Sequence, residues 1–143
     1  MKGQSLVVQF LLFFLIGLGL FTAIGGIFRL QSDIVRGDTA EINRKLIGSY
    51  VSSLAISMSS SCKECDFINQ TIKLKNVTAN YIVNLSITRD GLQISSEPGG
   101  GKSFASIHKL GQTYDMKGNA SSPLTVLLEL NNTRGTLNMT NKP

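Results

Sequence analysis

A stretch of 24 uncharged residues, 5–28, constrains this chain more than any other feature. It is rich in leucine, phenylalanine, isoleucine, valine and glycine. As an α-helix that rises about 1.5 Å per residue, it would be about 36 Å long, which is enough to cross the hydrocarbon core of a bilayer. A secretory signal peptide would have a shorter apolar region followed by a small-x-small cleavage site, and Phe21-Thr22-Ala23 fits that site poorly. We therefore expect a retained membrane helix.

The helical pattern continues beyond this apolar stretch. Apolar residues recur at spacings of three and four, which is typical of one face of a helix. They are Leu30, Ile34, Ile42, Leu46, Ile47, Tyr50, Val51, Leu54 and Met58. Gly37 favours a local bend, and serines at 57 and 59–61 interrupt the pattern. The sequence predicts one long helix over residues 4–58, with a hydrophobic membrane or assembly segment at 5–28 and an amphipathic second half.

From Cys65 onward the apolar residues recur with a period of two, which is typical of strands. Residues 71–75 and 81–88 alternate in this way, and Asp90-Gly91 predicts a tight hairpin turn before the next strand. Further strand candidates are 103–109, 112–116, 124–131 and 135–140. The expected fold class is α+β, in which the amphipathic half of the helix packs on a small antiparallel sheet or sandwich. This β-rich domain, residues 62–143, would contain about five to seven short strands.

Two signals disagree about the side of the membrane on which this β-rich domain lies. Basic residues near a membrane span favour the cytoplasmic side, and more of them follow the apolar stretch than precede it. They are Lys2 before it and Arg29, Arg36, Arg44 and Lys45 after it. Acidic residues are interspersed with these bases, and long C-terminal domains are exported largely regardless of charge.

Asn-x-Ser/Thr sequons favour the outer side of the membrane. Six of the ten asparagines begin such a sequon, and all six lie within residues 69–138, in the β-rich part of the chain. They are Asn69, Asn76, Asn84, Asn119, Asn131 and Asn138. Sequons accept N-linked glycans only in exported segments. We therefore expect an extracellular, glycosylated β-rich domain; the alternative is that these asparagines are only polar strand and loop positions.

The two cysteines, Cys62 and Cys65, have the spacing C-x-x-C. A structural zinc site needs four ligands, and the chain offers only His108 besides the cysteines. We favour a short-loop disulfide where the helix ends and the strands begin. A free thiol pair and an intermolecular bridge remain open from the spacing alone.

The motifs of enzymes are absent or incomplete. Glu97-Pro98-Gly99-Gly100-Gly101-Lys102-Ser103 resembles a phosphate-binding loop, but the position that requires the first glycine holds Ser96. His108 lies in a strand-like segment without an acidic neighbour, and the carboxylates are dispersed. The net charge is +5, but the basic residues form no cluster, so nucleic acid is not expected as a partner. We expect a protein that is not an enzyme and needs no cofactor or metal.

The N-terminus, Lys2-Gly3-Gln4-Ser5 followed directly by the long apolar stretch, resembles that of archaeal type IV pilin-like proteins with a class III signal peptide. The resemblance implies that a prepilin-type peptidase cuts between Gly3 and Gln4 and removes a leader of residues 1–3. It also implies that the apolar helix is retained and packs with other subunits in a filament core. The implied location is the cell membrane, with the C-terminal domain outside, or an extracellular filament.

Two positions depart from the pattern of that family, which usually has a serine at the third and a glutamate at the fifth position after the cut. Here those positions are Leu6 and Val8, while Ser5 is second and Gln9 is sixth. A glutamine can accept a hydrogen bond from a neighbouring subunit's amine but supplies no counter-charge. This difference favours a minor or specialised subunit, in assembly or adhesion, over a bulk filament subunit. The rival hypotheses are a stator-like accessory protein of the archaellum, a membrane-anchored envelope-binding module, and an exported enzyme.

Overall fold

The computed structural model describes residues 2–74, 82–97, 100–107 and 109–142. They form two compact units, Met1–Gly37 and Asp38–Pro143. The long helix α1, Lys2–Ser61, forms the whole of the first unit and contributes its C-terminal part to the second. The expected bend at Gly37 does not interrupt the helix, although the boundary between the units falls directly after this residue.

Helix α1 ends three residues later than the sequence predicts. It continues through the serines at 59–61, where the pattern of apolar residues is already lost. The hydroxyl of Ser60 donates a hydrogen bond to the carbonyl oxygen of Ser57 at 2.9 Å, and the amide of Cys62 donates to the carbonyl oxygen of Met58 at 3.0 Å. Serine costs only about 0.5 kcal/mol relative to alanine inside a helix, so backbone hydrogen bonding carries the helix through this segment.

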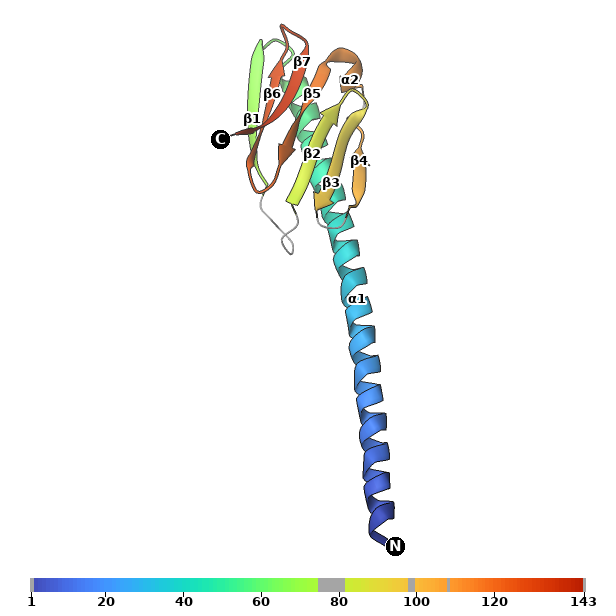
Figure 1. Ribbon diagram of the computed structural model, residues 1–143. Coiled ribbons are helices and arrows are strands. Elements are labelled where there is room, and N and C mark those ends of the chain that lie inside the picture. The colour runs from blue at the N-terminus through green and yellow to red at the C-terminus, as the bar shows by residue number, and fades with distance from the viewer. Residues whose placement is uncertain (1, 75–81, 98–99, 108, 143) are drawn as a thin grey trace. The chain divides into compact units, whose positions relative to one another are not determined.

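The second unit contains one seven-stranded sheet (Figure 1). Its strands are β1 (Phe67–Lys73), β2 (Ile82–Thr88), β3 (Gly91–Glu97), β4 (Lys102–Ala105), β5 (Asp115–Ser121), β6 (Thr125–Asn131) and β7 (Thr136–Lys142). They are arranged in the order β1-β6-β7-β5-β2-β3-β4. The predicted α+β fold class is therefore confirmed, and the β-rich part is a single sheet and not a sandwich.

The sequence suggested a purely antiparallel sheet, but the sheet contains one parallel pair of strands. Strands β5 and β7 pair in parallel, from Asp115 beside Thr136 to Gly118 beside Met139. The chain leaves β5 through a short turn, forms β6 one strand position further away, and returns as β7 in the gap between them. Because β7 is antiparallel to β6, it must run in the same direction as β5.

The predicted strand over 112–116 is wrong in its first half. A one-turn helix, α2 (Leu110–Thr113), occupies that segment, and β5 begins at Asp115. The amide of Tyr114 donates to the carbonyl oxygen of Leu110 at 2.8 Å, which closes this turn. Gly111 lies so close to the carbonyl oxygen of Arg89 that a Cβ would not fit. This close approach is a tertiary constraint that alternation in the sequence does not reveal.

The predicted strand over 103–109 is shorter in the structure, where β4 ends at Ala105. Ile107 then turns into the core and is 1% exposed. His108 and the predicted sequon at Asn76 lie outside the described residues.

The core of the second unit lies between one face of the sheet and the part of α1 after Gly37 (Figure 1). Helical residues at spacings of three and four are buried there, namely Ala40, Arg44, Gly48, Val51, Ala55 and Met58. A Cβ on Gly48 would lie 2.8 Å from Cδ1 of Ile94 and 3.1 Å from Cβ of Ala105, so glycine permits close contact of the helix with β3 and β4. No helix of the described residues packs on the opposite face of the sheet (Figure 1), and we call it the open face.

Candidate functional site

The apolar segment of α1 is exposed throughout the first unit. Every residue from Leu6 to Gly37 is exposed, and the side chains include Leu6 at 71% and Phe21 at 76%. Surface of this extent and composition is found where a chain meets lipid or another protein. By length and composition the helix can cross a membrane, so this segment suggests a membrane anchor or a signal sequence.

The residues predicted for processing and assembly lie at the start of this helix. Gly3 and Gln4 belong to the first turn of α1. Gln9 is exposed within the apolar segment, one helical turn after Ser5. Cleavage at Gly3–Gln4 and a role of Gln9 in assembly remain predictions from the resemblance.

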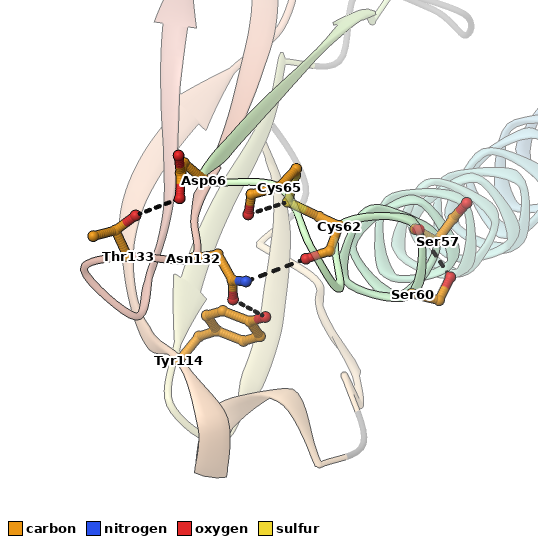
Figure 2. Close-up of a disulfide and its surroundings, with 8 residues drawn as sticks. All are labelled: Ser57, Ser60, Cys62, Cys65, Asp66, Tyr114, Asn132 and Thr133. Atoms are coloured by element: carbon orange, nitrogen blue, oxygen red, sulfur yellow. Dashed lines mark hydrogen bonds between the residues drawn. A yellow bond between two sulfur atoms is a disulfide. The ribbon is translucent and has the colours of Figure 1, made fainter.

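Cys62 and Cys65 form an intramolecular disulfide where α1 ends (Figure 2). Of the three states that their spacing leaves open, the structure has this one, and the chain contains no other cysteine. The bond closes a short loop between the last turn of α1 and the start of β1. Cys62 is fully buried, so the bridge belongs to the core of the domain and is not a surface thiol site.

Three residues that the sequence did not single out surround this disulfide (Figure 2). The Asn132 side chain donates from Nδ2 to the carbonyl oxygen of Cys62 at 3.3 Å and accepts at Oδ1 from the Tyr114 hydroxyl at 3.0 Å. The amide of Asn132 donates to the carbonyl oxygen of Asp66 at 2.9 Å. These bonds join the turn after β6 to the end of the helix. No local pattern signals them, because their partners are far apart in the sequence.

A buried arginine is the other feature that the sequence did not reveal. Arg44 is 8% exposed. Its Nη1 donates to the hydroxyl of Ser96 at 2.6 Å, and its Nε donates to the hydroxyl of Ser103 at 3.3 Å. Among the described residues no carboxylate lies within ion-pair distance of it; the exposed pair Glu41–Lys45 beside it on α1 is separate. The guanidinium therefore depends on neutral hydroxyls from β3 and β4.

The five sequon asparagines that the structure describes all lie on the open face of the sheet or at its margin. In a strand, residues two apart project from the same face. Asn69, Asn84, Asn119 and Asn138 each lie within a strand, so the hydroxyl residue of each sequon projects beside its asparagine. The strand register supports this placement. Asn69 and Asn138 both pair with Glu129 of β6, and Glu129 projects from the open face because it alternates with the buried residues Leu128 and Leu130.

These asparagines differ in exposure and in their bonds. Asn69 and Asn119 are exposed, whereas Asn84, Asn131 and Asn138 are half-buried. Nδ2 of Asn84 donates to Glu97 at 3.3 Å. At the β6–β7 turn, Oδ1 of Asn131 accepts from the amide of Arg134 at 2.8 Å, and the hydroxyl of the same sequon, on Thr133, donates to Asp66 at 3.2 Å. The turn sequon is therefore engaged within the fold.

A polar hollow of about 530 Å³ lies over strands β5, β2 and β3 on the open face. We call it the amide groove. Its lining residues are Asn84, Leu85, Ser86, Gln93, Ser95, Asn119, Ala120, Ser121 and Asn141. None of them is charged, although the whole chain has a net charge of +5. The groove combines amides and hydroxyls, which both donate and accept hydrogen bonds.

The described residues hold no cluster of histidine, cysteine or carboxylate side chains that could bind a metal ion. The loop that resembles a phosphate-binding motif is followed by strand β4 and not by the helix that such a site requires.

Comparisons with known proteins add no relative. The chain matches no protein-family model, no curated protein and no solved structure.

Proposed function

We propose that this protein is a structural subunit of an archaeal surface filament of the type IV pilus kind. The observation that supports the proposal is the architecture: an exposed apolar helix at the N-terminus, followed by a largely antiparallel sheet packed on the same helix. This is a type IV pilin-like architecture. A helix of this kind has two hydrophobic environments open to it, the bilayer before assembly and the helices of neighbouring subunits afterwards.

In this proposal a prepilin-type peptidase acts at the cytoplasmic face of the membrane and cuts between Gly3 and Gln4. Lys2 keeps the leader in the cytoplasm because a charge is costly to move across the bilayer. Removal of residues 1–3 takes away that charge. The apolar helix can then leave the bilayer and pack with other subunits.

Gln9 argues for a minor or specialised subunit. It is the one amide within the first turns of the apolar segment, at the position next to the one where a filament-forming relative would have a carboxylate. An amide supplies a hydrogen bond without a counter-charge to the new N-terminal amine of a neighbour. Such a subunit suits the initiation or the tip of a filament better than its repeated body.

The open face of the sheet would carry N-linked glycans of the exported domain at sequons outside the amide groove. Asn69 is the best acceptor on geometric grounds, because it is exposed on the edge strand β1 and Thr71 of its sequon is exposed beside it. The turn sequon at Asn131 is the poorest, because its amide oxygen and the Thr133 hydroxyl both bond within the fold.

Mass spectrometry of the mature N-terminus in an archaeal host tests this proposal. We expect a chain that begins at Gln4. A Gly3→Val variant should retain residues 1–3 and should be absent from filaments in immunogold electron microscopy, whereas the matched Lys2→Arg variant should be processed and incorporated. Retention of Met1 in the unaltered protein, or a cut after the apolar segment, would contradict the assignment to pilin-like subunits.

A further inference from the structure

We propose that the amide groove on the open face of the sheet binds an uncharged saccharide presented by another molecule. The inference goes beyond filament assembly. It concerns only the unit Asp38–Pro143 and does not depend on how the apolar helix is used.

Several polar side chains that line the groove have no hydrogen-bond partner among the described residues. Within the described part of the chain, the side chains of Ser86, Gln93, Ser95 and Asn119 take part in no hydrogen bond. They come from three neighbouring strands, β2, β3 and β5. The register aligns them, because Ser86 pairs with Asn119 on one side and with Gln93 on the other.

The groove also has a fixed frame. Asn141 accepts a hydrogen bond at Oδ1 from the amide of Ser121 at 3.0 Å, and its Nδ2 donates to the hydroxyl of the same serine at 3.3 Å. Leu85 and Ala120, which line it as well, are 1% and 4% exposed and belong to the core. The floor is therefore rigid, and the free amides and hydroxyls stand on it.

Charge decides the class of ligand. Nucleic acids and acidic polymers are held by lysine and arginine, and none lines this groove. Acidic side chains that would hold a cation are also absent from its lining. Each hydroxyl of a sugar donates one hydrogen bond and accepts others, which is the same dual capacity that amide and hydroxyl side chains have.

An aromatic side chain lies beside the groove on the same face. Phe104 of β4 pairs directly with Gln93 and is 60% exposed. Its ring covers the backbone of Gly91, where a Cβ would lie 2.5 Å from Cζ. Small-ligand sites occupy about 300–1,000 Å³ and usually combine apolar or aromatic surface with a few polar groups. The groove has a comparable volume of about 530 Å³ but a mainly polar lining, so Phe104 beside it supplies the aromatic surface. The groove suits a di- or trisaccharide unit whose apolar C–H face rests on the ring.

Asn84 and Asn119 each begin a sequon, and both asparagines line the groove. A glycan attached to either would occupy the space that the proposal gives to a ligand from another molecule. Asn84 is half-buried and already donates to Glu97. The proposal therefore requires these two sequons to be unmodified, whatever the state of Asn69.

The test uses the full chain, produced in a bacterial host without N-glycosylation and purified in detergent micelles. Saturation-transfer NMR is recorded with four neutral probes, namely maltopentaose, cellopentaose, mannopentaose and chitopentaose. An oligogalacturonate and a single-stranded DNA oligonucleotide serve as charged probes. We expect saturation transfer to at least one neutral probe and none to the charged probes.

Variants assign the binding to the groove. Gln93→Ala and Phe104→Ala should each raise the Kd of the bound probe by about fivefold to tenfold, which corresponds to the loss of one hydrogen bond or one ring contact. Gln70→Ala is the matched control, because Gln70 is also an exposed strand glutamine but lies on β1, away from the groove. It should leave binding unchanged. The positions are exposed, so thermal unfolding should confirm that all three variants fold.

Four results would overturn the proposal. They are binding of none of the neutral probes, equal binding of a charged probe, equal effects of Gln93→Ala and Gln70→Ala, and full glycan occupancy of Asn84 or Asn119 in protein from the native host. None of these results bears on cleavage at Gly3–Gln4, so a failure here is distinguishable from a failure of the filament assignment.

Discussion

The buried guanidinium of Arg44 gives the sharpest test of how the helix is held on the sheet. Nη1 of Arg44 donates to the hydroxyl of Ser96, which is 2% exposed, at 2.6 Å. Ser96→Ala removes this acceptor and leaves the buried charge with the longer bond to Ser103 alone. A hydrogen bond to a charged group contributes about 1.5–3 kcal/mol to the free energy of unfolding, so the variant should lose an amount in this range.

The neighbouring serine is the matched control. Ser95 lies on the same strand, but it projects from the open face, and its side chain takes part in no hydrogen bond among the described residues. Ser95→Ala should therefore change the free energy of unfolding by less than about 0.5 kcal/mol. The two substitutions have the same chemistry and differ only in the face of the strand.

Thermal unfolding of the full chain in detergent, followed by near-ultraviolet circular dichroism, measures this difference. For a domain of about 100 residues, 1 kcal/mol corresponds to about 4–5 °C in Tm. Ser96→Ala should lower the Tm by roughly 6–15 °C and Ser95→Ala by less than about 3 °C.

A double-mutant cycle separates the hydrogen bond from other effects of the substitution. In an Arg44→Met background no buried charge remains, so Ser96→Ala should cost less than about 0.5 kcal/mol. If Ser96→Ala costs the same with arginine and with methionine at position 44, the reasoning about the guanidinium is wrong. Equal losses for Ser96→Ala and Ser95→Ala would refute the assignment of faces along β3.

Three further predictions follow from other contacts. Gly48→Leu should lower the free energy of unfolding by about 1–3 kcal/mol in urea titration, because its side chain would overlap Ile94; a stability equal to that of the unaltered chain would argue against this close contact. The double variant Cys62→Ala/Cys65→Ala should lose about 2 kcal/mol in the same assay, since loop closure by a short disulfide is lost, and dithiothreitol should have no effect on it. Gln9→Glu should increase incorporation into filaments, counted by immunogold labelling; unchanged incorporation would show that the missing carboxylate does not limit assembly.

Much of the fold could be predicted because its signals are local. The uncharged residues 5–28 and the three-and-four spacing of apolar residues identify the helix. The predicted buried face is only partly right: Val51 and Met58 are buried, whereas Ile42, Leu46 and Tyr50 of the same predicted set are exposed. Alternation over β2 and β6 identifies those strands. The hairpin after β2 is also predicted, but its turn is one residue earlier than the sequence indicates: Arg89 and Asp90 form it, and Gly91 already pairs with Thr88 as the first residue of β3. Each of these features is set by residues within a few positions of one another, and periodicity reports it directly.

The candidate site was predicted only in part. Sequons and the C-x-x-C pair are local motifs, so their residues could be named from the sequence. The groove could not, because it is assembled from β2, β3 and β5, and Gln93 and Ser95 carry no motif. Arg44 was counted only as a positive charge near the membrane, and nothing near it in the sequence indicates that it is buried against Ser96, 52 residues away.

The sequence by itself determined that this protein has an uncharged N-terminal helix, an amphipathic continuation and a β-rich C-terminal part, because side-chain periodicity and chain length dictate these. Only the tertiary structure decided that β7 lies between β5 and β6, that α2 replaces part of a predicted strand, and that one sheet face stays open. The physical reason is that strand order and burial depend on contacts between distant segments. The amide groove exists because that order places three polar strand faces side by side.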